Sequence, residues 1–311
     1  MTKKKYPHLY GPVPSRRLGY SLGVDLLPFK TCTLNCVYCQ LGKTPKTTIR
    51  RRKFFSEEQI LQEIEDFLKS GVRVDFITFS GSGEPTLNLS IGSLIRKIKK
   101  ITGKPVAVLT NSTLLTRRAV RRDLEEADVV VPSLDAADQK TFEKVNRPHP
   151  SLKASEIIKG LVSFRRQFKG QIWLEILLVR GLNDSPAHLE KLKKAADRIN
   201  PDRIHLNTVV RPPAEKTASP LSADELEKIK EFFGPKAEVI ARFHQKEQEN
   251  APADLEQAIL SMVRRRPVSL DDLERAVGRP KHDLSLILQQ LTESKKIKKV
   301  EHNGIVFYEP A

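Results

Sequence analysis

The chain has 311 residues, of which 39% are hydrophobic and 30% charged, a balance typical of a globular protein with one large domain and a smaller one. It contains no long apolar segment, and no apolar run follows its basic N-terminus. The sequence therefore predicts neither a transmembrane helix nor a secretory signal, and it predicts a cytoplasmic location. The formal net charge of +16 favours a polyanionic partner such as RNA or DNA, although a solvated lysine-rich surface would give the same charge.

Short apolar segments alternate with amphipathic segments over the first three quarters of the chain. Strands are predicted at 21–28, 74–80, 105–111, 128–135, 172–179 and 203–210. Helices are predicted at 56–68, 91–101, from 116 onward, 138–145, 155–168, 187–199 and 222–233. This alternation predicts an α/β fold with a parallel sheet, curled by right-handed crossovers into a partial (β/α)6 barrel of the TIM type. Functional loops then follow the carboxyl ends of the strands.

The C-terminal part of the chain has a different pattern. Helices are predicted at 254–264, 269–278 and 280–293, followed by a hairpin that turns at Asn303 and Gly304. The chain is accordingly divided into a core domain (1–243), a linker (244–252) and a domain that resembles a winged helix (253–311). Because this last domain has ten Lys and Arg residues against nine Asp and Glu residues, docking of a macromolecule is favoured over reading of DNA bases.

Three cysteines, Cys32, Cys36 and Cys39, lie within eight residues in a C-x3-C-x2-C pattern and are the only cysteines of the chain. A cubane [4Fe-4S] cluster normally takes four cysteines, so three thiolates leave one iron open for another ligand. Tyr38 places an aromatic ring beside that open position. A zinc site would usually add a second ligand pair, and an odd number of cysteines argues against a disulfide framework.

This cysteine loop resembles that of the radical S-adenosylmethionine (SAM) enzymes. The resemblance implies one [4Fe-4S] cluster on Cys32, Cys36 and Cys39, SAM as the second cofactor, and a ferredoxin or flavodoxin type of electron donor. It also implies reductive cleavage of SAM to a 5′-deoxyadenosyl radical, which abstracts a hydrogen atom from the substrate. The protein's part in such chemistry is to orient the cofactor and exclude water and oxygen.

The same resemblance assigns SAM-binding roles to other loops. The segment Ser82-Gly83-Glu84-Pro85 matches a Gly-Gly-Glu type loop that contacts the methionyl amino group, with Ser82 in place of the first glycine. Polar residues after the next two strands are assigned to the methionyl carboxylate and the ribose, and two later residues to the adenine wall and to SAM or substrate. The full set implied is Tyr38, Ser82, Gly83, Glu84, Pro85, Thr110, Asn111, Ser133, Asp135, Val179 and Asn207.

Four arginines are candidates for substrate binding: Arg16, Arg17, Arg180 and Arg211. For Arg16 and Arg17, an ion pair with an acidic helix is an equal alternative. The segment around them, Gly-Pro-Val-Pro-Ser-Arg-Arg-Leu-Gly, looks like a radical SAM branch related to the wyosine-base tRNA synthases. Those relatives carry further N-terminal cysteines, whereas this chain has none, so its supply of ligands predicts a single cluster.

Two functional hypotheses follow. The first is a single-cluster radical SAM enzyme that acts on RNA or another macromolecule. The alternative is an iron-sulfur regulator that binds nucleic acid through the winged helix. The residues assigned to SAM favour the enzyme, because a redox-sensing regulator does not need them.

Overall fold

The computed structural model describes residues 6–15, 17–241 and 255–311. Arg16 and the predicted linker lie outside these described residues. In the part of the chain that is described, no helix is both long enough and apolar enough to span a bilayer.

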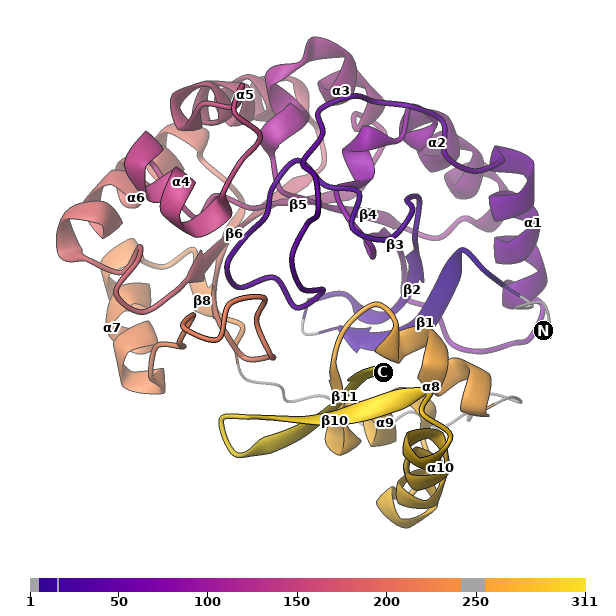
Figure 1. The fold of residues 1–311 in the computed structure, drawn as a ribbon. Helices are drawn as coiled ribbons and strands as arrows, with labels where there is room; N and C mark the ends of the chain where they lie inside the picture. Colours follow the sequence, from indigo (N-terminus) through magenta and orange to yellow (C-terminus); the bar gives the residue numbers. More distant parts are fainter. Residues whose placement is uncertain (1–5, 16, 242–254) are drawn as a thin grey trace.

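An eight-stranded sheet with sequential strand order forms the larger domain (Figure 1). β1 and β2 are antiparallel, and β2 to β8 run parallel to one another. The strands are β1 (Leu9–Ser15), β2 (Gly19–Val24), β3 (Phe76–Phe79), β4 (Val106–Thr110), β5 (Val129–Pro132), β6 (Gln171–Leu178), β7 (Arg203–Thr208) and β8 (Ala237–Val239). The predicted α/β class and the six predicted strands, observed as β2 to β7, are confirmed.

Two strands were not predicted, and both lie at the edges of the sheet. β1 contains Pro12 and Pro14, which lack the N–H that a central strand would need and are tolerated at an edge. β8 has only three residues, too few to give a periodic signal. β1 therefore extends the barrel sheet toward the C-terminal part of the chain.

The helices lie around the outside of the curved sheet, and the long segment between β2 and α1 lies inside the arc (Figure 1). They are α1 (Glu57–Leu68), α2 (Ile91–Thr102), α3 (Arg118–Asp123), α4 (Gln139–Asn146), α5 (Ala154–Gln167), α6 (Pro186–Ile199) and α7 (Ala223–Phe233). Apolar side chains such as Ile77, Leu94 and Phe164 are fully buried in one core. Polar side chains cap two of these helices: Ser56 Oγ accepts the Gln59 N–H at 3.3 Å at the start of α1, and Ser222 forms a capping box with Glu225 at the start of α7.

Residues 255–311 form three helices and a small antiparallel sheet with a core of their own. The elements are α8 (Leu255–Val263), β9 (Val268–Ser269), α9 (Leu270–Val277), α10 (Lys281–Glu293), β10 (Ile297–His302) and β11 (Ile305–Pro310). Asn303 and Gly304, with φ of 53° and 72°, form the predicted turn between β10 and β11. The predicted helices and hairpin are present, and their assignment to the winged-helix class stays a prediction.

This C-terminal part packs against β1, and Val13 contacts its core. Two ion pairs join it to the barrel: Arg265 Nε lies 3.2 Å from Asp25 Oδ2, and Arg211 Nη2 lies 3.2 Å from Asp272 Oδ2. His302 Nε2 lies 3.2 Å from the carbonyl oxygen of Val209. The contacts place the smaller unit at the end of the barrel where the functional loops lie.

Candidate active site

A cavity of about 410 Å³ opens at the carboxyl ends of the parallel strands. Its volume falls in the range of roughly 300 to 1,000 Å³ that is usual for small-molecule sites. Residues of the cysteine loop, the loops after β3 to β5, and strand β7 share this cavity. The predicted site residues that line it are Arg17, Cys32, Cys36, Tyr38, Cys39, Ser82, Gly83, Glu84, Thr110, Asn111, Ser133, Asn207 and Arg211.

The cysteine loop is held by backbone contacts on both sides. On one side Thr31 bridges to Gly83, so the loop lies beside the segment after β3. On the other side Val37 N donates to the Val145 carbonyl oxygen at 2.9 Å, and Asn35 N donates to that of Asn146 at 3.0 Å. The end of α4 and the loop after β3 thus fix the three cysteines at the mouth of the barrel.

Each cysteine sulfur has a side-chain nitrogen within hydrogen-bond distance, from Lys30 just before the loop or from an asparagine elsewhere in the chain. Lys30 Nζ lies 3.2 Å from Cys39 Sγ, Asn111 Nδ2 lies 3.5 Å from Cys32 Sγ, and Asn146 Nδ2 lies 3.4 Å from Cys36 Sγ. Hydrogen bonds to sulfur tune cysteine-ligated clusters. Sequence reasoning missed Lys30 and Asn146. A charge two residues before the first cysteine was a signal for Lys30, but no pattern connects Asn146 to Cys36.

The electrostatics of the loop suit a cationic group. Burial raises the pKa of Cys32 to about 12, and burial raises the pKa of Cys36 further still. Thiolates in such a place need a compensating positive charge, which iron supplies. Among the described residues, no three His, Cys, Asp or Glu side chains converge as ligands of a single ion. A cubane cluster accepts each thiolate at a different iron, so its cysteines need not converge on one point. The donor set therefore fits a cluster.

Glu84 lies beside the cysteine loop, and the residue is only 2% exposed. Its Oε1 accepts hydrogen bonds from the Thr86 hydroxyl at 2.6 Å and the Thr110 hydroxyl at 2.7 Å, and its Oε2 accepts the Asn111 N–H at 2.7 Å. Burial raises the pKa of this carboxyl, and these hydrogen bonds oppose that rise. Oε2 retains room for a further donor, because a carboxylate oxygen accepts about two hydrogen bonds.

Ser82 is held by a residue that the sequence did not single out. Asp25 Oδ1 accepts the Ser82 N–H at 3.1 Å, and Asp25 Oδ2 accepts the Ser82 hydroxyl at 2.5 Å. The same Oδ2 accepts a hydrogen bond from Arg265 Nε at 3.2 Å. A carboxylate at the end of β2 thus connects the segment after β3 with the C-terminal part of the chain.

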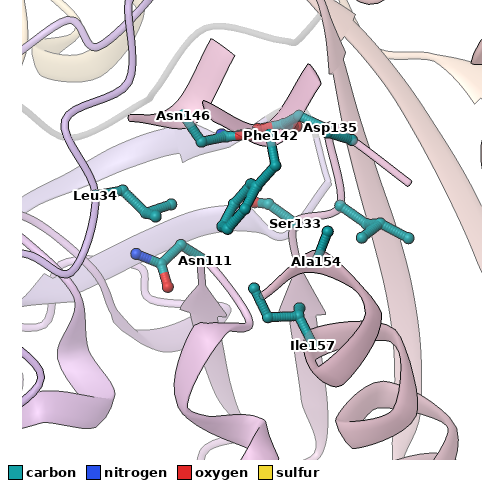
Figure 2. A pocket seen from close by; sticks show the side chains of 10 residues that line it. Leu34, Asn111, Ser133, Asp135, Phe142, Asn146, Ala154 and Ile157 are labelled. Carbon is teal, nitrogen blue, oxygen red and sulfur yellow. Dashed lines mark hydrogen bonds between the residues drawn. The ribbon is translucent and has the colours of Figure 1, made fainter. Parts of the chain in front are cut away.

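Asp135 lies behind the main cavity. It accepts hydrogen bonds from the Tyr38 hydroxyl, from Asn146 Nδ2 at 2.7 Å and from the Leu177 N–H at 3.0 Å. It borders a pocket of about 10 Å³ that is also lined by Asn111, Ser133, Asn146 and Phe142 (Figure 2). That volume is about enough for one water molecule. Asp135 therefore positions Tyr38 and Asn146 from behind the cysteine loop.

The remaining predicted residues divide into two groups. Arg17 and Asn207 line the cavity, and both contact Glu175 of β6. The ion pair that was the alternative to substrate binding for Arg17 is therefore present, but its acidic partner lies on a strand and not on a helix. Pro85, Asp135, Val179 and Arg180 do not line it. Val179 is buried in an apolar cluster with Val37, and Arg180 forms an exposed ion pair with Glu225.

Three cysteines and a buried glutamate that share one cavity at the mouth of a parallel α/β barrel define a class of proteins. A radical SAM superfamily model matches residues 26–192, so the chain belongs to that superfamily. Its fold is similar to that of a radical SAM methyltransferase from Sphaerobacter thermophilus, with a TM-score of 0.55 and 17% identity over 73% of this chain and 67% of that one. The protein is thus an enzyme of the radical SAM type.

Two sequence relatives match over nearly all of this chain. The chain is 32% identical to the UPF0026 protein MJ1312 of Methanocaldococcus jannaschii over 309 residues, 96% of this chain and 94% of that protein. It is 36% identical over 310 residues to a GTPase Obg of Brachyspira hyodysenteriae, covering 99% of this chain. The chain spans only 46% of the length of that second relative.

Proposed function

We propose that the protein holds one [4Fe-4S] cluster on Cys32, Cys36 and Cys39 and cleaves SAM reductively. When bound, the cluster and SAM would supply one-electron chemistry: reductive cleavage of a C–S bond of the sulfonium would give methionine and the 5′-deoxyadenosyl radical needed to abstract a hydrogen atom from the substrate. The remaining work, which is to bind, orient and shield these groups, falls to the protein's own residues.

The observation that carries this proposal is the proximity of Glu84 to the cysteine loop. Glu84 N donates to the Thr31 carbonyl oxygen at 3.1 Å, one residue before Cys32, and both segments line one cavity. A ligand whose amino group contacts Glu84 therefore lies beside the cysteines. An amino acid that carries a sulfonium group, as SAM does, matches this arrangement of carboxylate and thiols.

The other cavity residues have roles that follow from their hydrogen-bonding groups. Glu84 Oε2 accepts a hydrogen bond from the methionyl ammonium group. The donors Thr86, Thr110 and Asn111 keep the Glu84 carboxylate in place. Asn111 and Ser133 offer polar groups at the ends of β4 and β5 to the methionyl carboxylate and the ribose. Tyr38, held by Asp135, shields the open side of the cysteine loop.

The substrate in this proposal is RNA or another macromolecule, and the electron donor is a ferredoxin or flavodoxin type of protein. The net charge of +16 supports an anionic partner. The C-terminal part of the chain lies at the cavity and is suited to docking such a partner. Arg265 and Arg266 of the smaller unit line the cavity.

The test is an anaerobic assay of 5′-deoxyadenosine with SAM and dithionite, after cluster reconstitution. The wild type is expected to form 5′-deoxyadenosine, and Cys36→Ala is expected to form none, because one iron loses its ligand. Lys46→Ala, an exposed residue of the same loop, is the matched control and should behave as wild type. A wild-type protein with full iron and sulfide content that forms no 5′-deoxyadenosine would contradict the proposal.

A further inference from the structure

One guanidinium group at the cavity has no ion-pair partner among the described residues. Arg266 lies in the turn between α8 and β9, three residues after the end of α8, and it lines the cavity together with Arg265. Its Nε is buried and has no hydrogen-bond partner in the part of the chain that the structure describes. A buried charged donor without a partner is costly, so a native protein that retains one has a reason to do so.

The other cationic residues of the cavity all have partners. Arg17 pairs with Glu175, Arg265 Nε lies 3.2 Å from Asp25 Oδ2, and Lys30 Nζ lies 3.2 Å from Cys39 Sγ. Arg211 Nη2 lies 3.2 Å from Asp272 Oδ2. Among the described residues, Arg266 is therefore the cationic residue of this cavity whose side chain has neither an ion-pair partner nor a hydrogen-bond partner.

The charge around Arg266 is also unbalanced. Asp272 is the carboxylate that acts on Arg266, and it is already paired with Arg211 and lies 3.9 Å from Arg275 Nη2. One carboxylate thus faces three guanidinium groups. Burial and, after it, the nearby charge of Arg211 lower the pKa of Arg266 to about 10. A bound anion would correct both the missing hydrogen bonds and the excess positive charge.

We propose that Arg266 binds an anionic oxygen group of the substrate, either a phosphate or a carboxylate. A guanidinium group presents a planar fork of N–H donors that matches both groups. Since Arg266 belongs to the C-terminal part and the cysteines to the barrel, the substrate lies between the two units. This inference rests on the proposed function, because it names the chemistry of the substrate that the radical would attack.

The test measures equilibrium binding of inorganic phosphate and of acetate to the full-length protein at constant ionic strength. The protein carries a reconstituted cluster and saturating SAM, without reductant. We expect saturable binding of at least one anion, and the tighter of the two identifies the group. Arg266→Met should weaken that binding on the order of tenfold or more, the effect of losing a charge-assisted hydrogen bond. Arg264→Met, an exposed neighbour that does not line the cavity, should leave it unchanged.

A second measurement separates ligand binding from a structural role. Without added anion, Arg266→Met should unfold in urea at the same or a higher concentration than wild type, because the variant no longer buries an unpaired charge. A clear loss of stability would instead assign Arg266 to holding the two units together and would overturn the proposal.

Two further outcomes would also overturn it. One is that the wild type binds neither anion in the presence of SAM. The other is that a parallel titration without SAM shows anion binding that is absent with saturating SAM, since Arg266 would then serve the SAM carboxylate. Neither measurement requires an electron or the formation of 5′-deoxyadenosine. Failure here is therefore distinguishable from failure of the SAM cleavage assay.

Discussion

At the scale of single residues, the three cysteines differ in the nitrogen that contacts each sulfur. Cys32 and Cys36 each receive a neutral amide from an asparagine, whereas Cys39 receives the Lys30 ammonium group. Lys30 is itself buried, so solvent screens its charge little. Positive charge and hydrogen bonds near the sulfurs of a cluster favour its reduced form. Lys30 is therefore the residue of this loop with the largest expected effect on the cluster.

Replacement of Lys30 by methionine is expected to make the reduction potential of the bound cluster more negative, on the order of tens of millivolts. The reason is the loss of a buried positive charge beside Cys39. The measurement is an anaerobic redox titration followed by electron paramagnetic resonance. Lys46→Met, which removes an exposed lysine from the same loop, should keep the wild-type potential. An unchanged or more positive potential in Lys30→Met would refute this account.

At the scale of elements, the segment after β3 approaches the cysteine loop so closely that only glycine fits at one position. A Cβ atom on Gly83 would lie 1.9 Å from the Thr31 carbonyl oxygen, which is a backbone atom held by the bridge between the two segments. The two loops would have to move apart to admit any side chain. The close approach is what brings Glu84 next to Cys32.

Gly83→Ala is accordingly expected to weaken SAM binding by at least about tenfold, because it separates Glu84 from the cysteine loop. Gly71→Ala is the matched control: Gly71 has φ of 72°, but a Cβ there meets no atom within 4 Å. This control should lose about 1 kcal/mol of stability from the left-handed backbone and bind SAM normally. Equilibrium dialysis with labelled SAM compares the two, and equal affinities would disprove the close-approach argument.

At the scale of the whole molecule, Asp25 links the two units through a buried ion pair. The side chains of Arg265 and Asp25 are 7% and 8% exposed. Arg265 also donates to the Pro7 carbonyl oxygen at 3.1 Å, and its guanidinium lies 4.8 Å from the centre of the Tyr10 ring. Since Asp25 also holds Ser82, docking of the C-terminal part is coupled to the position of the segment after β3.

Arg265→Met should lower the free energy of unfolding by about 3 kcal/mol, since it leaves the Asp25 carboxylate buried without its cation. The double variant with Asp25→Asn should lose less than the sum of the two single variants. Urea unfolding of all four proteins gives the coupling energy. Additive losses would mean that the two side chains do not interact.

The second ion pair between the units predicts a dependence on pH. Burial would raise the pKa of Asp272, but Arg211 and Arg266 outweigh it and lower that pKa to about 2. The folded state therefore binds this proton less tightly than the unfolded chain, whose Asp pKa is about 3.9. The stabilisation is complete above about pH 4 and is lost as the pH falls toward about 2.

Wild-type protein should accordingly lose stability more steeply than Asp272→Asn between about pH 4 and pH 2. The check is the urea midpoint measured as a function of pH for both proteins. Parallel curves would show that Asp272 does not contribute. The prediction concerns stability and requires neither cluster nor SAM.

The sequence by itself determined the parallel α/β barrel, because the six predicted strands and the helices between them carry their own hydrophobic period, and Ser56 marks the start of the first helix as its cap. It also determined that the three cysteines lie close together, because a loop of eight residues cannot separate them far. Only the tertiary structure decided which distant residues serve them. Asn146, Asp25 and Arg266 reach the site through packing of α4, β2 and the C-terminal helices, and no local pattern encodes such contacts, since they depend on how whole elements dock.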